Sequence, residues 1–166
     1  MPIAIQKYDD PFLPFCKAVI DATRDVVCAY VYDLAAFLSI GAAGIVALER
    51  AIAYARADGV TVTVLHSPFA SDEFAEAAGG TGLSVDAVTL TAAADAAPYL
   101  AANLGVYVVG GTSTNGVGWM DTSSGTLHLE AGDTPLIIRL VKADVVNAHR
   151  REGFEAVLRQ AVEALR

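Results

Sequence analysis

The sequence predicts an α/β domain with a mainly parallel sheet. Two observations predict this class: short β-branched runs alternate with amphipathic helical segments, and 54% of the 166 residues are hydrophobic. Strands that alternate with helices imply right-handed crossovers between parallel neighbours. The mean hydropathy of +0.46 is consistent with strands buried on both faces. The length suits one domain with its own core, so we expect a single domain over residues 1–166.

The helices are predicted from capping residues and from apolar side chains at three- and four-residue spacing. Asp10 and Pro11 indicate a helix start, because a carboxylate caps the first turn and proline fits the first helical position. Apolar residues then recur on one face as far as Thr23. A short helical turn is expected after Asp33. The other predicted helices cover residues 42–56, 71–78, 92–102 with a break near Pro98, and 151–165.

The predicted strands are apolar runs bounded by turn residues. They cover residues 26–31, 60–65, 85–90, 105–109 and 136–141, with a first strand at 3–5 and a short strand at 126–130 in an irregular stretch. Residues 110–118 are rich in glycine and small polar residues and are expected to form a loop. Parallel sheets carry their binding sites at the carboxyl ends of the strands, so functional side chains are expected there.

Composition excludes several kinds of partner. The net charge of −8 and the presence of three lysines argue against nucleic acid, which requires clustered basic residues. The longest apolar run, residues 26–40, is interrupted by Asp33 and is too short to span a bilayer, and the amino terminus lacks the features of a signal peptide. We therefore expect a cytoplasmic protein without a membrane span. Neither Cys16 and Cys28 nor the three histidines show metal-ligand spacing, so no metal and no cofactor are expected.

Seven segments carry a combined signal through their order and spacing. They are FCKAVIDAT at 15–23, VCAY at 27–30, residues 44–54, VL at 64–65, DAVT at 86–89, residues 95–100, and GVYVV at 105–109 followed by TS at 112–113. Together they resemble the first helix and the second to fifth strands, with their helices, of bacterial orotidine 5′-monophosphate decarboxylases. The resemblance is collinear over most of residues 12–113 and weak beyond.

The resemblance implies an eight-stranded (β/α) barrel that acts as a homodimer and decarboxylates orotidine monophosphate without metal or organic cofactor. In that family a lysine protonates the carbon that loses carbon dioxide, and aspartates, one of them from the partner subunit, flank the lysine. A complete barrel has about 250 residues, and the family's sixth and seventh strands have no clear counterpart here. We therefore expect a reduced or incomplete (β/α) TIM-type barrel.

The catalytic positions that the resemblance marks carry other residues. Val31 stands where the family has a lysine after the second strand, and His66, Pro68 and Ser71 stand where it has Asp, Lys and Asp after the third. Gly111 stands where it has an arginine. Because this chemistry depends on placed charges, we do not expect decarboxylation. The predicted function is that of a catalytically degenerate module that self-associates or binds a protein partner.

The alternative is an enzyme or binder of a small phosphorylated or nucleotide-like ligand with altered chemistry. Its candidate catalytic residues are His66, Ser67 and Asp33, since imidazole titrates near neutral pH and can pair with Ser67 or Ser71 as base and nucleophile. The structural interpretations also remain open: His66 can hydrogen-bond a loop, and Asp33 can cap the turn that follows it.

Ligand contacts are expected after the predicted strands at 85–90 and 105–109. The candidate ligand-binding residues are Thr91, Thr112, Ser113 and Asn115. The last three lie in the loop at 110–118, which either cradles an anion with its backbone N–H groups and hydroxyls or is simply flexible. Farther along, Trp119 and Met120 either anchor an interface or cover an edge of the core.

Overall fold

The computed structural model of the chain describes residues 1, 3–67, 69–111, 117–131, 134–141 and 153–165. These residues group into two compact units. The first contains the described parts of Met1–Tyr30, Ala36–Thr61 and Val141–Arg166, and the second contains those of Val31–Ala35 and Val62–Leu140. No helix in the described ranges has both the length and the apolar character needed to span a membrane.

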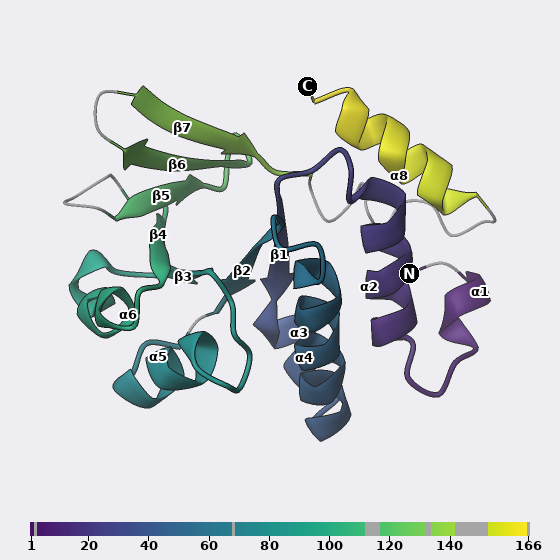
Figure 1. The fold of residues 1–166 in the computed structure, drawn as a ribbon, viewed down its shortest axis with the longest axis horizontal. Helices are drawn as coiled ribbons and strands as arrows, with labels where there is room; N and C mark the ends of the chain where they lie inside the picture. Colours follow the sequence, from purple (N-terminus) through teal and green to yellow (C-terminus); the bar gives the residue numbers. More distant parts are fainter. Residues whose placement is uncertain (2, 68, 112–116, 132–133, 142–152, 166) are drawn as a thin grey trace. The chain divides into compact units, whose positions relative to one another are not determined.

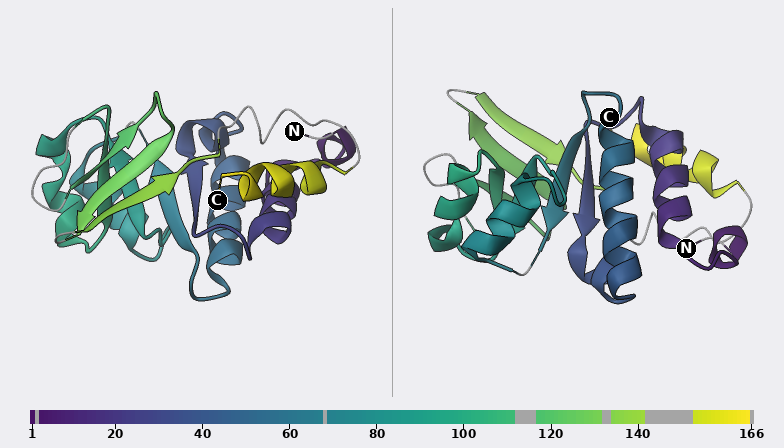
Figure 2. Two further views of the ribbon diagram at one scale, coloured as in Figure 1. Left: turned by 90° about the horizontal axis from the view of Figure 1, so that it is seen from above. Right: turned by 60° about the horizontal axis from the view of Figure 1, so that its bottom comes forward.

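The first unit is helical. Helix α2 (Phe12–Thr23) packs against both α4 (Ala42–Arg56) and α8 (Phe154–Glu163), as Figures 1 and 2 show. The predicted start of α2 is shifted by one residue: Pro11 is the N-cap and Phe12 the first helical residue, and the Phe12 N–H donates to Asp10 Oδ1 at 3.2 Å. The predicted bounds of α4 are confirmed. The apolar stripes that predicted these helices are the faces they bury.

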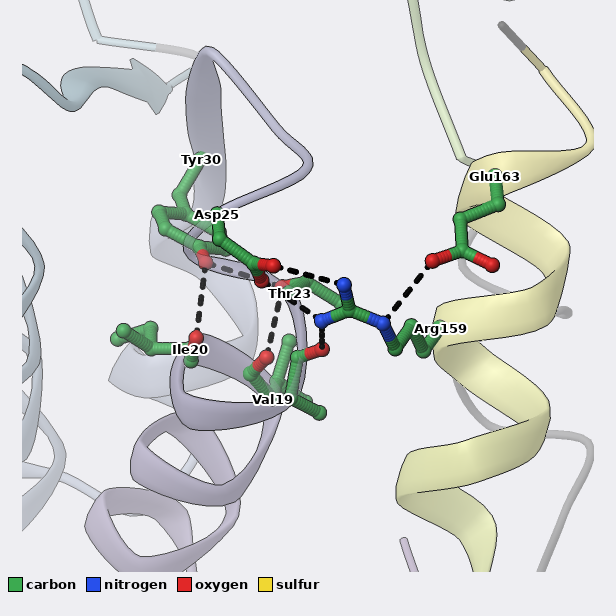
Figure 3. Close-up of polar contacts among 8 residues, drawn as sticks. Val19, Ile20, Thr23, Asp25, Tyr30, Arg159 and Glu163 are labelled. Atoms are coloured by element: carbon green, nitrogen blue, oxygen red, sulfur yellow. Dashed lines mark hydrogen bonds and ion pairs between the residues drawn. The ribbon is translucent and has the colours of Figure 1, made fainter.

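A charged contact fixes α8 to the end of α2 (Figure 3). The Arg159 guanidinium donates to both carboxylate oxygens of Asp25 at 2.7 Å and to the carbonyl of Ala22 at 3.2 Å, and its Nε donates to Glu163 at 3.0 Å. The last carbonyls of a helix lack partners within the helix and carry partial negative charge. A guanidinium from α8 therefore satisfies the carboxyl end of α2.

The amino-terminal segment corrects one prediction. Residues 3–5 were expected to form a strand, but Ile3–Gln6 form the single helical turn α1. The Gln6 side-chain amide donates to the Met1 carbonyl at 2.7 Å, and the Tyr8 N–H donates to the Ile5 carbonyl at 3.2 Å. A run of three apolar residues is too short to separate strand from helix by its period.

The second unit is built on the sheet, whose strand order is β1-β2-β3-β4-β5-β6-β7. The pairs β2–β3, β3–β4 and β4–β5 are parallel. The strands are β1 (Ala29–Asp33), β2 (Val62–His66), β3 (Ala87–Leu90), β4 (Gly105–Val109), β5 (Gly118–Asp121), β6 (Thr126–Ala131) and β7 (Thr134–Arg139). The intervening helices are α3 (Leu34–Leu38), α5 (Asp72–Gly79), η1 (Ala93–Asp95) and α6 (Ala97–Ala101). The predicted break before Pro98 separates η1 from α6.

The sheet ends in an antiparallel meander that the sequence did not predict. β5 pairs with β6, and β6 with β7, in antiparallel register. Asp121 forms the β5–β6 turn by accepting hydrogen bonds from the N–H and hydroxyl groups of Ser123 and Ser124. Gly125 completes the turn with a φ of +68°, which favours glycine. Strand β5 has four residues and begins at a glycine, so the sequence there gave little indication of a strand.

One face of the sheet carries an apolar core cluster of the second unit. Its buried residues are Val64, Ala87, Tyr107 and Leu127, and the partly buried residues packed against them are Val31, Met120, Leu129, Ile138 and Leu140. Successive side chains of a strand point to opposite faces, so Met120 belongs to this core face and Trp119 to the other. Helix α6 packs against β4. Alternating strand–helix units with a mainly parallel sheet thus form an incomplete (β/α) TIM-type barrel.

Candidate functional site

The site begins where β2 and β3 end. His66 pairs with Thr89 in the sheet register, and His66 Nδ1 lies 2.7 Å from Thr89 Oγ1. Thr89 Oγ1 also accepts a hydrogen bond from the Ser67 N–H at 3.4 Å. Thr89 is fully buried, whereas His66 is half-buried. The contact joins the imidazole at the end of β2 to the neighbouring strand β3.

The side chains of His66 and Ser67 form hydrogen bonds with different partners. The buried Ser67 Oγ accepts a hydrogen bond from the Phe69 N–H at 3.0 Å, and the His66 ring is bonded to Thr89. The loop after β2 is therefore held by its own polar groups. Thr89 was absent from the sequence-based candidates, because a threonine inside an apolar strand gives the same signal whichever way it points.

Ser71 caps α5. Its Oγ accepts a hydrogen bond from the Phe74 N–H at 3.1 Å, and the Ser71 backbone is extended, as expected for an N-cap residue. Behind it, the fully buried Tyr99 donates its hydroxyl to the Phe69 carbonyl at 3.2 Å and accepts the Ser71 N–H at 3.3 Å. Burial raises the pKa of Tyr99, so this phenol stays neutral. Tyr99 thereby clamps the loop between β2 and α5.

The other candidates lie at further strand ends. Asp33 is exposed and accepts the Ala35 N–H at 3.0 Å, so it caps α3. Thr91 is exposed just after β3. Thr112, Ser113 and Asn115 lie outside the described residues.

Uncharged side chains dominate the described strand ends. Val31, where the resemblance places the family's lysine, packs against the apolar core. Asp33 is the one charged residue among positions 33, 66–67, 90–91 and 109–111, at the ends of β1 to β4, and Asp121 ends β5. The described ranges contain no group of three or more histidine, cysteine or carboxylate side chains that could hold a metal ion. Burial, with a smaller contribution from Asp10, raises the pKa of Cys16 to about 12. The ends of β2, β3 and β4 therefore offer hydrogen bonds rather than placed charge.

Fold and site together define an incomplete (β/α) barrel with polar but largely uncharged strand ends. No family model matches the sequence. The sequence is 41% identical over 56 residues to orotidine 5′-phosphate decarboxylase of Parabacteroides distasonis, which is 34% of this chain and 20% of that protein. It is 46% identical over 52 residues to the decarboxylase of Roseiflexus castenholzii, which is 31% of this chain and 19% of that protein.

Solved structures extend the similarity to the fold. The Leishmania donovani OMP decarboxylase matches with a TM-score of 0.54 and 26% identity, over 63% of this chain and 44% of that one. The Leishmania donovani UMP synthase matches with a TM-score of 0.53 and 26% identity, over 75% of this chain and 28% of that one. The chain is thus a divergent relative of the orotidine 5′-phosphate decarboxylases. The matches span about a fifth of the curated relatives and less than half of the solved ones.

Proposed function

We propose that this chain is a catalytically degenerate orotidine 5′-phosphate decarboxylase-like protein that acts as a self-associating interaction or structural module. One observation supports the proposal. Where the resemblance places the family's charged catalytic residues, the described side chains of this chain make packing, hydrogen-bond or helix-capping contacts. Val31 packs in the core, His66 bonds to Thr89, and Ser71 caps α5. The family's reaction relies on charges aimed at the reacting carboxylate and carbon, and an apolar or capping side chain cannot supply them.

A turnover assay tests the loss of activity. Purified chain is mixed with orotidine monophosphate, and the formation of uridine monophosphate is followed by absorbance and by chromatography. An active decarboxylase of the family at equal concentration sets the detection limit. We expect no conversion above the protein-free blank, because losing one member of such a charge set commonly costs several powers of ten in rate. Conversion that grows with the concentration of this chain would refute catalytic degeneracy.

The half-buried His66 supports a second candidate function. Its Nδ1 is bonded to Thr89, while its Nε2 has no hydrogen-bond partner among the described residues. This nitrogen, with the exposed Thr91, supports a site for a small phosphorylated or nucleotide-like ligand at the strand ends.

A thermal-shift experiment tests this site, because a ligand that binds the folded state raises the melting temperature. Uridine monophosphate and ribose 5-phosphate should then stabilise the wild type but not His66→Ala, with Thr122→Ala, on the exposed β5–β6 turn, as the matched control.

A further inference from the structure

The hydrogen bonds around Thr89 determine which nitrogen of the His66 ring carries the proton. Thr89 is fully buried on β3, and its Oγ1 lies 2.7 Å from His66 Nδ1 and 3.4 Å from the Ser67 backbone nitrogen. A backbone N–H can only donate, so Thr89 Oγ1 accepts the bond from Ser67. The hydroxyl also has one proton of its own, which needs an acceptor.

His66 Nδ1 is the acceptor for that proton. Within the described part of the chain, the Thr89 hydroxyl has two hydrogen-bond partners, the Ser67 N–H and His66 Nδ1. If Nδ1 carried a proton, two N–H groups would point at Oγ1 and the hydroxyl proton would have no acceptor. A buried donor without an acceptor loses its bond to water and gains nothing in return, which costs free energy. The neutral imidazole therefore accepts at Nδ1 and carries its proton at Nε2.

This tautomer makes His66 a hydrogen-bond donor at the strand ends. Its Nε2 has no hydrogen-bond partner among the described residues, and the ring is half-buried. Asp33 ends the neighbouring strand β1, and its carboxylate already accepts the Ala35 N–H. Lysine and arginine are absent from positions 33, 66–67 and 90–91. A ligand at these strand ends therefore meets a neutral donor and no cationic side chain from those positions.

We propose that His66 binds an acceptor oxygen of a small ligand through its Nε2–H group, and that Thr89 is the positioning residue that fixes this tautomer. The acceptor is a phosphate or a carbonyl oxygen. The inference rests on the ligand site given above as the second candidate function and names the chemistry of its recognition. It also removes the role of base toward Ser67 or Ser71, because the one ring lone pair of the neutral imidazole is bonded to Thr89.

Nitrogen NMR of the free protein tests the tautomer. At about pH 8 imidazole is mostly neutral, and nitrogen–proton correlation spectra distinguish a protonated from an unprotonated ring nitrogen. The chain has three histidines, and the signals that disappear in His66→Gln belong to His66. We expect a protonated Nε2 and an unprotonated Nδ1. A His66 that is protonated at Nδ1 overturns the inference and leaves the ligand site standing.

A matched pair of threonine variants tests the positioning role. Thr89→Val removes the hydroxyl and keeps the branched shape, so His66 should become a mixture of both tautomers. Thr122→Val, on the exposed β5–β6 turn, should keep the wild-type pattern. A folded Thr89→Val protein with an unchanged pattern overturns the role of Thr89, and the wild-type spectrum decides the tautomer even if this variant does not fold.

Two small probes test the donor role. Inorganic phosphate offers charged acceptor oxygens, and uridine offers neutral carbonyl oxygens. At least one should shift the His66 Nε2 signal and raise the melting temperature, and the active probe identifies the kind of oxygen. Because the neutral ring already donates, binding should not weaken between about pH 6 and about pH 8. Binding that is lost as the pH rises shows that an imidazolium charge is required, which overturns the neutral donor.

Two substitutions separate a donor from an acceptor at position 66. The amide of glutamine keeps N–H groups at the end of the side chain, whereas an ionised glutamate offers only acceptors. His66→Glu should bind the active probe about tenfold more weakly than His66→Gln, the loss expected for one hydrogen bond. Circular dichroism checks that both variants are folded. Equal binding by the two folded variants overturns the donor role alone, whereas a wild type that binds neither probe overturns both this inference and the ligand site.

Discussion

Ser71 shows how one hydroxyl at a helix start satisfies a backbone N–H group. The resemblance places an aspartate of the decarboxylases here, and the hydroxyl of Ser71 accepts the N–H of Phe74 at the start of α5. Either residue can cap a helix, since both offer a side-chain oxygen to an N–H group that has no partner within the helix. The capping function therefore needs an acceptor oxygen but no charge.

Replacing Ser71 separates capping from charge. Ser71→Ala removes the acceptor and should lower the free energy of unfolding by about 1 kcal/mol. Ser71→Asp keeps an acceptor and adds a negative charge near the positive end of the α5 dipole, so its stability should equal or exceed that of the wild type. Urea titrations of the three proteins measure the difference. A Ser71→Ala protein as stable as the wild type would contradict the assigned role.

Helix α8 shows how one element is held in place by a few polar contacts together with its apolar stripe. Its Phe154, Leu158 and Val162 are buried, and Arg159 joins it to the end of α2 through Asp25 and Ala22. The bidentate geometry adds direction to the apolar contact, because both guanidinium N–H groups must meet the carboxylate in one plane.

Substitution of Arg159 measures this contact. Arg159→Gln removes the ion pair and leaves the Ala22 carbonyl to water, so we expect a small loss in the free energy of unfolding, because solvent screens an exposed pair. Glu163→Gln removes only the pair within α8 and should cost a few tenths of a kcal/mol. A double-mutant cycle with Asp25→Asn isolates the cross-helix term. Strict additivity of Arg159→Gln and Asp25→Asn would show that the pair contributes nothing.

At the scale of the whole molecule, the sequence predicts one domain, and the boundary between the two compact units falls inside β1 and α3. A strand and a helix that belong partly to each unit cannot persist intact when only one unit unfolds. We therefore expect a single cooperative transition, as is usual for domains of about this size.

Core substitutions in each unit test that cooperativity. Leu48→Ala lies in the helical unit and Leu127→Ala in the sheet unit, and both leucines are buried. Each should cost about 2–5 kcal/mol and should shift the same transition, followed by far- and near-ultraviolet circular dichroism. The conservative Leu48→Met is the control and should cost less than about 1.5 kcal/mol. Two separated transitions, each moved by only one substitution, would contradict a single domain.

Local patterns determined much of this fold. The Asp10 contact at the start of α2, the apolar spacing of α2 and α4, and the β-branched runs of β2, β3 and β4 specify these elements through neighbours close in sequence. The same local signals failed at residues 3–5 and at β5, where three or four residues fit more than one structure. The candidate His66 was found because it follows a strand, but its partner Thr89 was not.

The sequence by itself determined the alternation of strands and helices, because residue identity and short-range spacing specify it. Only the tertiary structure decided that the sheet ends in an antiparallel meander, that Met120 faces the core while Trp119 stacks on His128, and that Ser71 and Tyr99 fix the loop after β2. Strand pairing and register join residues far apart in the chain, and a shift of one residue reverses every side chain. The face that a side chain occupies is therefore a property of the assembled sheet.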